Sequence, residues 1–219
     1  MKVAHLWQFV FWKLDLRPLC IECEREFEQI TEPICLKCGR PQKDNAVCSD
    51  CVEWERRLGT ERTLRQNRSI FLYNDWMKEL MNRYKFRGDA ILAQIFQSYL
   101  QQAKKRYFPH ALTIIPIPLA EDRLLERGFN QALLLAQLLN LPIIEPLKKG
   151  KSSKQSKKSR HERIHSKNPF FVSDPQLVIG KSILLIDDIY TTGTTLHQAA
   201  LKLYEAGAKD VQSLTLIRG

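Results

Sequence analysis

From residue 89 onward, short apolar runs alternate with segments whose apolar residues recur at helical spacing. Apolar runs bounded by Pro, Gly or charged residues predict buried strands, and the spacing i, i+3, i+4 predicts helices that bury one face. We predict strands at 111–118, 182–188 and 211–217, a weaker strand at 142–147, and helices at 90–106, 129–140 and 195–208. This alternation favours an α/β fold, a mostly parallel sheet flanked by helices.

Capping residues sharpen two of the predicted boundaries. The segment 62–73 ends in a predicted short strand, and a helical pattern follows to residue 88. Asn74 or Asp75 is a suitable N-cap for that helix, and Gly88 a suitable stop. Gly207 stands where the glycine after a helix end belongs.

The six cysteines form three CxxC pairs, and none occurs after residue 51. The pairs are Cys20 and Cys23, Cys35 and Cys38, and Cys48 and Cys51. In a reducing cytosol this spacing predicts metal ligation more than disulfides, and no βαβ context supports a redox CxxC. Four thiolates complete a structural zinc site, so six are two more than one ion needs. We predict a zinc-binding module at 1–60 and an α/β domain at 61–219.

The net charge of +10 is concentrated in one segment. Residues 148–167 contain nine basic residues against one acid, a local charge of +8. With no apolar face, this segment predicts a flexible loop at 148–168, able to close over pyrophosphate or to follow a nucleic-acid backbone. No apolar run reaches membrane-spanning length and no signal peptide is recognisable, so we expect a cytoplasmic protein, with contact to the inner membrane face only through partners.

The stretch ILLIDDIYTTGTT, residues 183–195, carries the clearest candidate chemistry. Asp187 and Asp188 close a buried strand, and ligands of parallel sheets bind beyond such carboxyl ends. We expect the strand to end at these aspartates, so that both project into the crevice. The loop that follows, with Gly193 and four threonines, offers amide and hydroxyl donors to an anion. The pattern therefore predicts a site for a ribose 5-phosphate.

This stretch resembles the phosphoribosyl-pyrophosphate (PRPP) motif of type I phosphoribosyltransferases. PIPLAEDRLLERGFNQA, KQSKKSRHER and the CxxC pairs with CLKCGRPQ extend the resemblance to the ComF family over nearly the whole chain. Membership implies a type I phosphoribosyltransferase-like fold with a zinc-ribbon-like module. It also implies a role in DNA uptake during natural transformation, PRPP and single-stranded DNA as ligands, and a helicase-like ComFA partner.

The resemblance also implies roles for individual residues. Asp187 and Asp188 would bind the ribose hydroxyls as catalytic residues, with Arg163 of the basic loop touching ligand. Arg123 and Arg127 would contact phosphate or form a solvated helix flank. The pyrophosphate, commonly with Mg²⁺, would lie near the loop that starts at 116–119. The 5′-phosphate and its surroundings would involve Tyr190, Thr191, Thr192, Gly193, Thr194 and Thr195.

Two alternatives stay open at this point. The motif occurs in enzymes that transfer the phosphoribosyl group from PRPP to an acceptor and in regulators that bind such ligands without turnover, so whether this chain is an enzyme is undecided. In the module, the resemblance favours Cys35, Cys38, Cys48 and Cys51 as zinc ligands. Cys20 and Cys23 are then orphaned or replace one of the other pairs. Relatives commonly carry a further upstream pair, which would fit a chain that starts before Met1.

Overall fold

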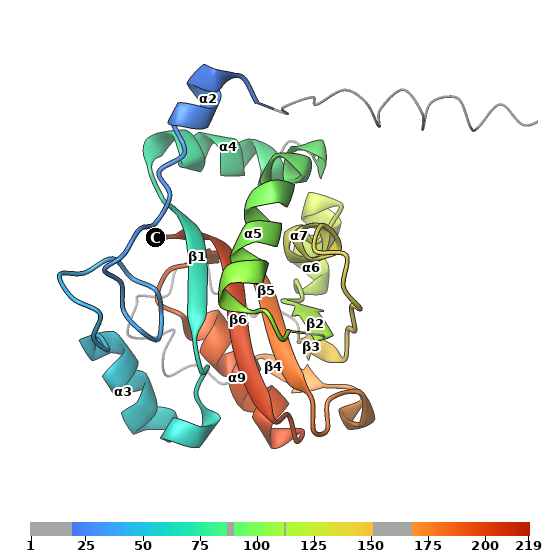
Figure 1. Ribbon diagram of the computed structural model, residues 1–219. Coiled ribbons are helices and arrows are strands. Elements are labelled where there is room, and N and C mark those ends of the chain that lie inside the picture. Colours follow the sequence, from blue (N-terminus) through green and yellow to red (C-terminus); the bar gives the residue numbers. More distant parts are fainter. Residues whose placement is uncertain (1–18, 87–89, 112, 151–167) are drawn as a thin grey trace, which may run out of the picture.

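The computed structural model describes residues 19–86, 90–111, 113–150 and 168–219. Its central sheet has the strand order β1-β6-β5-β2, and every neighbouring pair is parallel (Figure 1). The strands are β1 (Asn67–Leu72), β6 (Asp210–Arg218), β5 (Ser182–Tyr190) and β2 (Thr113–Pro116). The predicted parallel α/β sheet is therefore confirmed.

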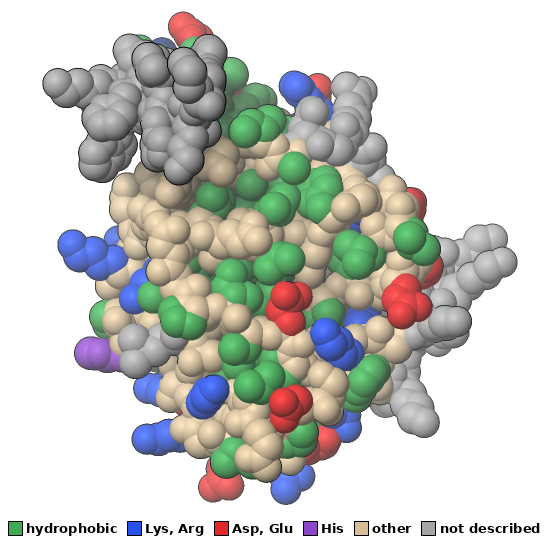
Figure 2. All heavy atoms as spheres, turned by 90° about the vertical axis from the view of Figure 1, so that its right-hand side faces the viewer, with side chains coloured by type: hydrophobic (Ala, Val, Ile, Leu, Met, Phe, Trp, Pro, Cys, Tyr) green, Lys and Arg blue, Asp and Glu red, His purple; other side chains and the backbone are tan. Residues whose placement is uncertain are grey.

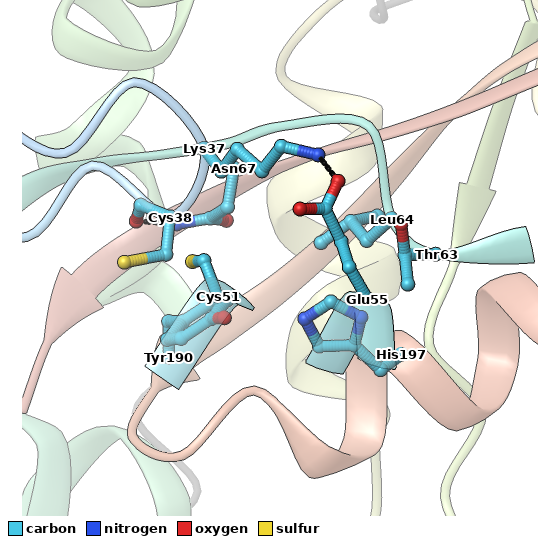
Figure 3. A pocket seen from close by; sticks show the side chains of 9 residues that line it. All are labelled: Lys37, Cys38, Cys51, Glu55, Thr63, Leu64, Asn67, Tyr190 and His197. Carbon is cyan, nitrogen blue, oxygen red and sulfur yellow. Dashed lines mark hydrogen bonds and ion pairs between the residues drawn. The ribbon is translucent and has the colours of Figure 1, made fainter. Parts of the chain in front are cut away.

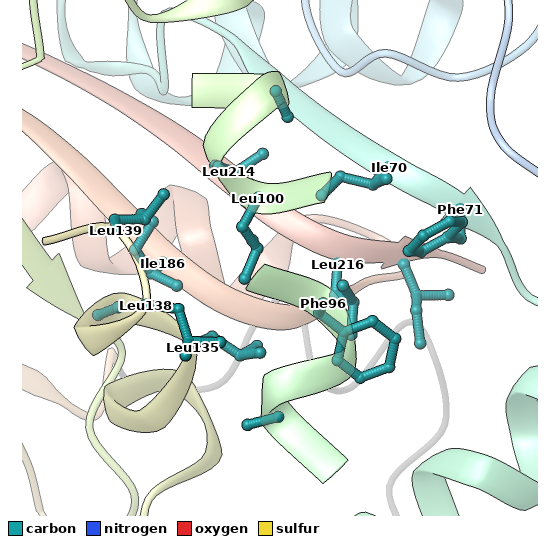
Figure 4. Packing of buried hydrophobic residues seen from close by; sticks show 14 of the residues in the cluster. Ile70, Phe71, Phe96, Leu100, Leu135, Leu138, Leu139, Ile186, Leu214 and Leu216 are labelled. Carbon is teal, nitrogen blue, oxygen red and sulfur yellow. The ribbon is translucent and has the colours of Figure 1, made fainter. Parts of the chain in front are cut away.

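Helices cover both faces of this sheet. On one side lie α5 (Gln97–Tyr107) and α7 (Gln131–Gln137), with α4 (Asp75–Phe86) packed into the same core, and on the other lies α9 (Thr194–Glu205) (Figure 1). The short helix α6 (Glu121–Arg127) buries no side chain. Beneath α5 and α7, Phe96, Leu100 and Leu135 are fully buried against the sheet (Figure 4). Burial of each such side chain contributes roughly 1.5–3 kcal/mol. A second cluster fills the space between the sheet and α9.

The predicted N-cap at Asn74 and the glycine after the last long helix are confirmed, whereas Gly88, the predicted stop of the first helix, lies outside the described residues. Asn74 caps α4, because its side-chain Oδ1 accepts a hydrogen bond from the amide of Met77 at 2.8 Å. Gly207 follows the end of α9 with φ of +92°, a conformation that side-chain-bearing residues avoid.

Three predicted elements differ from those observed. Residues Ala90–Phe96 form a 3₁₀ helix, η2, before α5 begins. With three residues per turn, the apolar residues no longer share one face, and Ile91 is 75% exposed. Strand β5 continues two residues beyond the predicted end, to Tyr190. In the 142–147 segment only Ile143 bridges to β2, and the strand that forms is β3 (Leu147–Lys149), antiparallel to β4 (Phe170–Val172).

The cysteine-rich segment is built from short pieces fastened to the sheet. It contains α2 (Ile21–Arg25), α3 (Ser49–Leu58) and the 3₁₀ turn η1 (Thr60–Arg62). A further 3₁₀ turn, η3 (Pro175–Leu177), precedes β5. The fully buried Asn67 in β1 donates its amide hydrogen to the carbonyl of Lys37 at 2.7 Å and its side-chain amide to that of Cys38 at 3.2 Å. The knuckle around Cys38 is thereby hydrogen-bonded directly to an edge strand. The domain division at residue 60 stays a prediction.

Candidate functional site

Asp187 and Asp188 lie inside β5, near its carboxyl end. The side-chain alternation of the strand reverses at this pair: the even-numbered residues before it and Ile189 after it join one core cluster, whereas the odd-numbered residues before it and Tyr190 join the other. Neither aspartate belongs to an apolar cluster, and each residue as a whole is partly buried. The carboxylate of Asp187 accepts a hydrogen bond from the amide of Asp188 at 2.9 Å. The expectation that both aspartates project after the strand has ended is therefore corrected: they occur within the strand, where its facing changes.

Two lysines complete the electrostatics of the aspartate pair. The Nζ of Lys85, on α4, lies 2.5 Å from a carboxylate oxygen of Asp188, and both side chains are at least four-fifths buried. Burial, together with repulsion from Asp188, raises the pKa of Asp187 to about 8. The amide of Asp188 and the charges of Lys85 and Lys149 offset only part of that rise. Asp188 is thus the ion-paired member and Asp187 the member poised to take up or release a proton.

The turn after β5 exposes donors at the start of α9. Gly193 precedes the helix with φ of +78° and has no side chain with which to cap it. The hydroxyls of Thr192 and Thr194 lie 2.8 Å apart and hydrogen-bond each other. The amide of Thr194 donates to the Thr192 hydroxyl at 3.4 Å. The amides of a helix start, with hydroxyls beside them, favour an anion. Thr191 and Thr195 flank this turn, so the structure brings the predicted loop residues together.

Tyr190 supports this turn from the inside. Its side chain is 3% exposed, and the guanidinium of Arg218 stacks on its ring at 4.2 Å. A Cβ atom on Gly193 would overlap the hydroxyl and ring of Tyr190. Gly193 is therefore required twice, for its positive φ and for close approach to this ring. A direct contact of Tyr190 with ligand stays a prediction.

The loop after β2 starts beside β5, where the amide of Ile117 donates to the carbonyl of Ile186 at 2.9 Å, and leads into α6. Asn130 caps α7 and donates its side-chain amide to the carbonyl of Ile117 at 3.0 Å, which fixes the start of the loop. Arg123 pairs with Glu126 at 3.0 Å, whereas Arg127 donates to the side chain of Gln131 at 2.9 Å. The ion pair of Arg123 lies within α6, which agrees with the alternative of a solvated helix flank. Contact of either arginine with phosphate stays a prediction.

Lys149, in β3 near the start of the basic segment, was missed as a site residue. Burial lowers its pKa, while the nearby Asp187 raises it and the charges of Arg127 and Arg123 lower it further. These four charges therefore share one neighbourhood. A cavity of about 550 Å³ opens next to it, between α6, α7 and the β3-β4 pair, on a face where hydrophobic side chains gather (Figure 2). The signal for Lys149 was its place at the start of the basic run; for Lys85 the sequence gives none. Arg163 and residues 151–167 lie outside the described residues.

Four cysteines form a site that fits zinc. The sulfurs of Cys35, Cys38, Cys48 and Cys51 all lie within 4.8 Å of one another. The distance from Cys35 to Cys51 is 3.8 Å and that from Cys38 to Cys48 is 3.7 Å. Zinc–sulfur bonds of about 2.3 Å in a tetrahedron place sulfurs about 3.8 Å apart, so the donor set matches Zn²⁺ in type and spacing. The buried Arg218 lowers the pKa of Cys38, after the larger effect of a hydrogen bond with Cys51.

Cys20 and Cys23 are not part of this cluster. Cys20 is exposed, and its sulfur accepts a hydrogen bond from the amide of Cys23 at 3.4 Å at the start of α2. Among the described residues, no other group of three or more Cys, His, Asp or Glu side chains is arranged to hold a metal.

Comparison with known proteins agrees with this geometry. Residues 124–219 match the model of the phosphoribosyl transferase domain, and residues 14–52 match the double zinc ribbon domain. The molecule is thus a type I phosphoribosyltransferase fold with an amino-terminal zinc ribbon. It is 44% identical to "Competence protein ComFC" of Bacillus subtilis (strain 168) over 97% of this chain and 89% of that protein. The chain belongs to the ComF family of competence proteins.

Two further relatives extend the comparison. "Competence protein ComFC" of Streptococcus pneumoniae (strain ATCC BAA-255 / R6) is 39% identical over 91% of this chain and 87% of that protein. "DNA utilization protein YhgH" of Salmonella typhi is 26% identical over 91% of this chain and 90% of that protein. In the described residues, no helix is long and apolar enough to cross a membrane.

Proposed function

We propose that this chain binds PRPP, or a ligand with the same ribose 5-phosphate group, at the carboxyl end of β5, and that it uses this site in the cytoplasmic handling of DNA during natural transformation. The observation that supports this most is the juxtaposition of Asp187 and Asp188 with the open turn at Gly193. Carboxylates accept hydrogen bonds from sugar hydroxyls, and the turn donates to phosphate. One compact ligand that carries both groups would satisfy both halves of the site.

The lysines beside the aspartates define how the site would respond to ligand. Lys85 already pairs with Asp188. The ribose hydroxyls would therefore join or replace an existing contact, while Asp187 is held by one amide hydrogen bond. A Mg²⁺ ion bound with the pyrophosphate would be held mostly by ligand oxygens and water, as is usual for this ion. The chain would contribute carboxylate charge near it.

Titration calorimetry with PRPP and Mg²⁺ tests the proposal. At a pH above 8, where the Asp187 carboxyl is ionised, we expect the Asp187→Asn and Asp188→Asn variants each to bind at least about tenfold more weakly, because a charge-assisted hydrogen bond contributes about 1.5–3 kcal/mol. Asp174→Asn is the matched control and should bind PRPP like wild type. Asp174 is exposed, and it caps η3, which precedes β5 in the chain. If all variants bound PRPP with the affinity of wild type, the proposed PRPP site at Asp187 and Asp188 would be wrong.

DNA binding is the second part of the proposal. It is supported by the names of the relatives and by the +8 charge of residues 148–167. The basic segment itself contains no aromatic residue, so we expect contact with the phosphate backbone of single-stranded DNA with little dependence on base sequence. A competence helicase of the ComFA type would be the natural partner in this step.

Salt dependence separates this contact from nonspecific charge. We expect the affinity for a single-stranded oligonucleotide to fall steeply with salt, and the triple change of Lys154, Lys157 and Lys158 to Gln to lower the slope by about 2, close to 0.7 per lost contact. The matched control changes Lys181, Lys202 and Lys209 to Gln, which lie outside the basic segment. A slope lowered equally by both triples would place DNA elsewhere.

Catalytic transfer is the alternative within the same site. The cavity of about 550 Å³ beside Lys149 offers room for an acceptor near the aspartates. Positioning and charge stabilisation would be the chain's contribution to such a transfer. Release of pyrophosphate from PRPP, stimulated by a candidate acceptor and lost in Asp187→Asn, would support turnover. PRPP that binds but stays intact with every acceptor offered would favour a binding role.

A further inference from the structure

The zinc ribbon touches the turn at the start of α9 directly. The indole Nε1 of Trp54, on α3, donates a hydrogen bond to the carbonyl oxygen of Thr192 at 3.2 Å. These residues are separated by 138 positions in the chain, so only the fold brings them together. Because the peptide unit is planar and trans, its N–H points opposite to its C=O. The bond from Trp54 to the Thr192 carbonyl therefore directs the amide of Gly193 away from the zinc ribbon.

A ring contact on α9 reinforces this bond. The indole of Trp54 stacks on the imidazole of His197, with ring centroids 4.4 Å apart and planes 13° from parallel. His197 lies in the first turn of α9 and is 4% exposed, and its Nδ1 has no hydrogen-bond partner among the described residues. Its position is therefore set by packing, with Trp54 as one wall. Through one side chain, α3 fixes both the turn and the helix start.

Trp54 is in turn fixed by the metal-binding part of the ribbon. Cys51, one of the four clustered cysteines, lies one helical turn before Trp54 on α3. Glu55, next to Trp54, forms an ion pair with Lys37, which lies between Cys35 and Cys38 (Figure 3). The orientation of α3, and with it that of Trp54, thus depends on the two knuckles holding together.

The opposite side of the turn has a second connection to the ribbon. Cys38, Cys51, Tyr190 and His197 surround the same small void (Figure 3). Tyr190 closes against Gly193, and the guanidinium of Arg218 stacks on the ring of Tyr190 at 4.2 Å. Residues of the ribbon and residues that support the turn therefore line one shared cavity.

We propose that Trp54 is a positioning residue for the phosphate-binding turn, so that the zinc-loaded ribbon sets the direction of the amides that receive the 5′-phosphate. This inference rests on the proposed PRPP site for its functional meaning. The zinc ribbon would then be part of the ligand site, beyond any role as a separate DNA-binding module. Loss of the indole N–H would loosen the turn even where zinc stays bound.

Hydrogen exchange of the zinc-loaded full chain, followed by mass spectrometry on peptides that cover residues 191–196, tests the inference. Trp54→Phe keeps a ring for His197 but removes the donor, and we expect exchange there to be about fivefold faster, as for one lost neutral hydrogen bond. Trp54→Ala removes both and is expected to give a change of at least about tenfold. Trp76→Phe is the matched control, because Trp76 contacts Phe27 in the other core cluster.

PRPP affinity and zinc content are measured on the same samples. We expect one zinc per chain in wild type and in Trp54→Phe, with PRPP binding about fivefold weaker in the variant and unchanged in Trp76→Phe. Unaltered exchange at 191–196 in zinc-loaded Trp54→Phe and Trp54→Ala would overturn the inference. If Trp54→Ala loses zinc, Trp54→Phe alone decides. If wild type fails to bind PRPP, the proposed ligand is wrong, and the exchange result still decides whether Trp54 positions the turn.

Discussion

The zinc knuckles and the aspartate corner of β5 are both clusters of ionisable side chains, but they are assembled differently. The four clustered cysteines come from 17 consecutive positions, 35–51, and their sulfurs already have the spacing of a tetrahedral thiolate site. The aspartate corner draws on α4, β5 and β3, and its charges are partly satisfied by one another through Lys85 and Asp188. One site is preset by local chain geometry, and the other depends on long-range packing.

This difference has an energetic consequence. A structural metal site contributes folding free energy directly, because its ligands are brought together only in the folded chain. The aspartate corner has the opposite character: a buried carboxyl beside a second carboxylate costs stability, and a ligand offsets that cost when it binds. Substitutions of the zinc ligands should therefore destabilise the folded protein, whereas a substitution in the aspartate corner can stabilise it.

The largest effect is expected at the knuckles. Cys38→Ser leaves three thiolates, and we expect loss of stoichiometric zinc and a fall in Tm of at least about 10 °C, equivalent to roughly 3 kcal/mol or more. Metal analysis and thermal unfolding measure both quantities. The double variant Cys20→Ser, Cys23→Ser is the control, with an expected content of one zinc per chain and a nearly unchanged Tm. Two zinc ions per chain in wild type and one in that control would show a second metal site at the first pair.

The next effect concerns two glycines with the same backbone conformation. Gly193 and Gly180 have φ of +78° and +71°, but a Cβ would overlap Tyr190 at Gly193 and meet nothing within 4 Å at Gly180. We expect Gly180→Ala to cost about 1 kcal/mol in the free energy of unfolding and Gly193→Ala about 3 kcal/mol. Urea unfolding measures the difference. Equal costs would mean that Tyr190 yields easily and does not support the turn.

The features that could be predicted from the sequence are those encoded by residues close together in the chain. The CxxC spacing predicted metal ligation by the cysteine pairs because such ligands are close in the chain, and the family resemblance selected the four that cluster. The apolar runs predicted β5 and β6 because a buried parallel strand leaves a continuous apolar signature. The turn at Gly193 was also legible as a local pattern. These features need no knowledge of what packs against them.

The remainder depended on tertiary contacts. Lys85 and Trp54 sit in ordinary helical patterns, and nothing in their neighbours in sequence reveals the carboxylate or the carbonyl that they meet. The three-residue strand β4 is too short for a periodic signal, and it forms because Phe170 pairs with Lys149 across the basic segment.

The smallest effect, and the one of opposite sign, is expected at Asp187. Its pKa in the folded chain is about 8, against 3.8 for the unperturbed group. Between these values the unfolded chain releases the proton while the folded chain keeps it. Stability from this group is therefore complete below about pH 4 and is lost as the pH rises toward 8. Asp187→Asn cannot ionise, so we expect it to be more stable than wild type at pH 8, by on the order of 2 kcal/mol, with no gain at pH 4.

Urea unfolding across pH 4 to 8 measures this gain, and Asp188→Asn is the informative comparison. It removes the repulsion that raises the pKa of Asp187 but also leaves the buried Lys85 without its carboxylate. We expect it to lose stability where Asp187→Asn gains it. A gain in Asp187→Asn that is independent of pH would mean that the carboxyl is already ionised in the folded chain. The aspartate corner would then not cost stability, and in this respect it would not differ from the metal site.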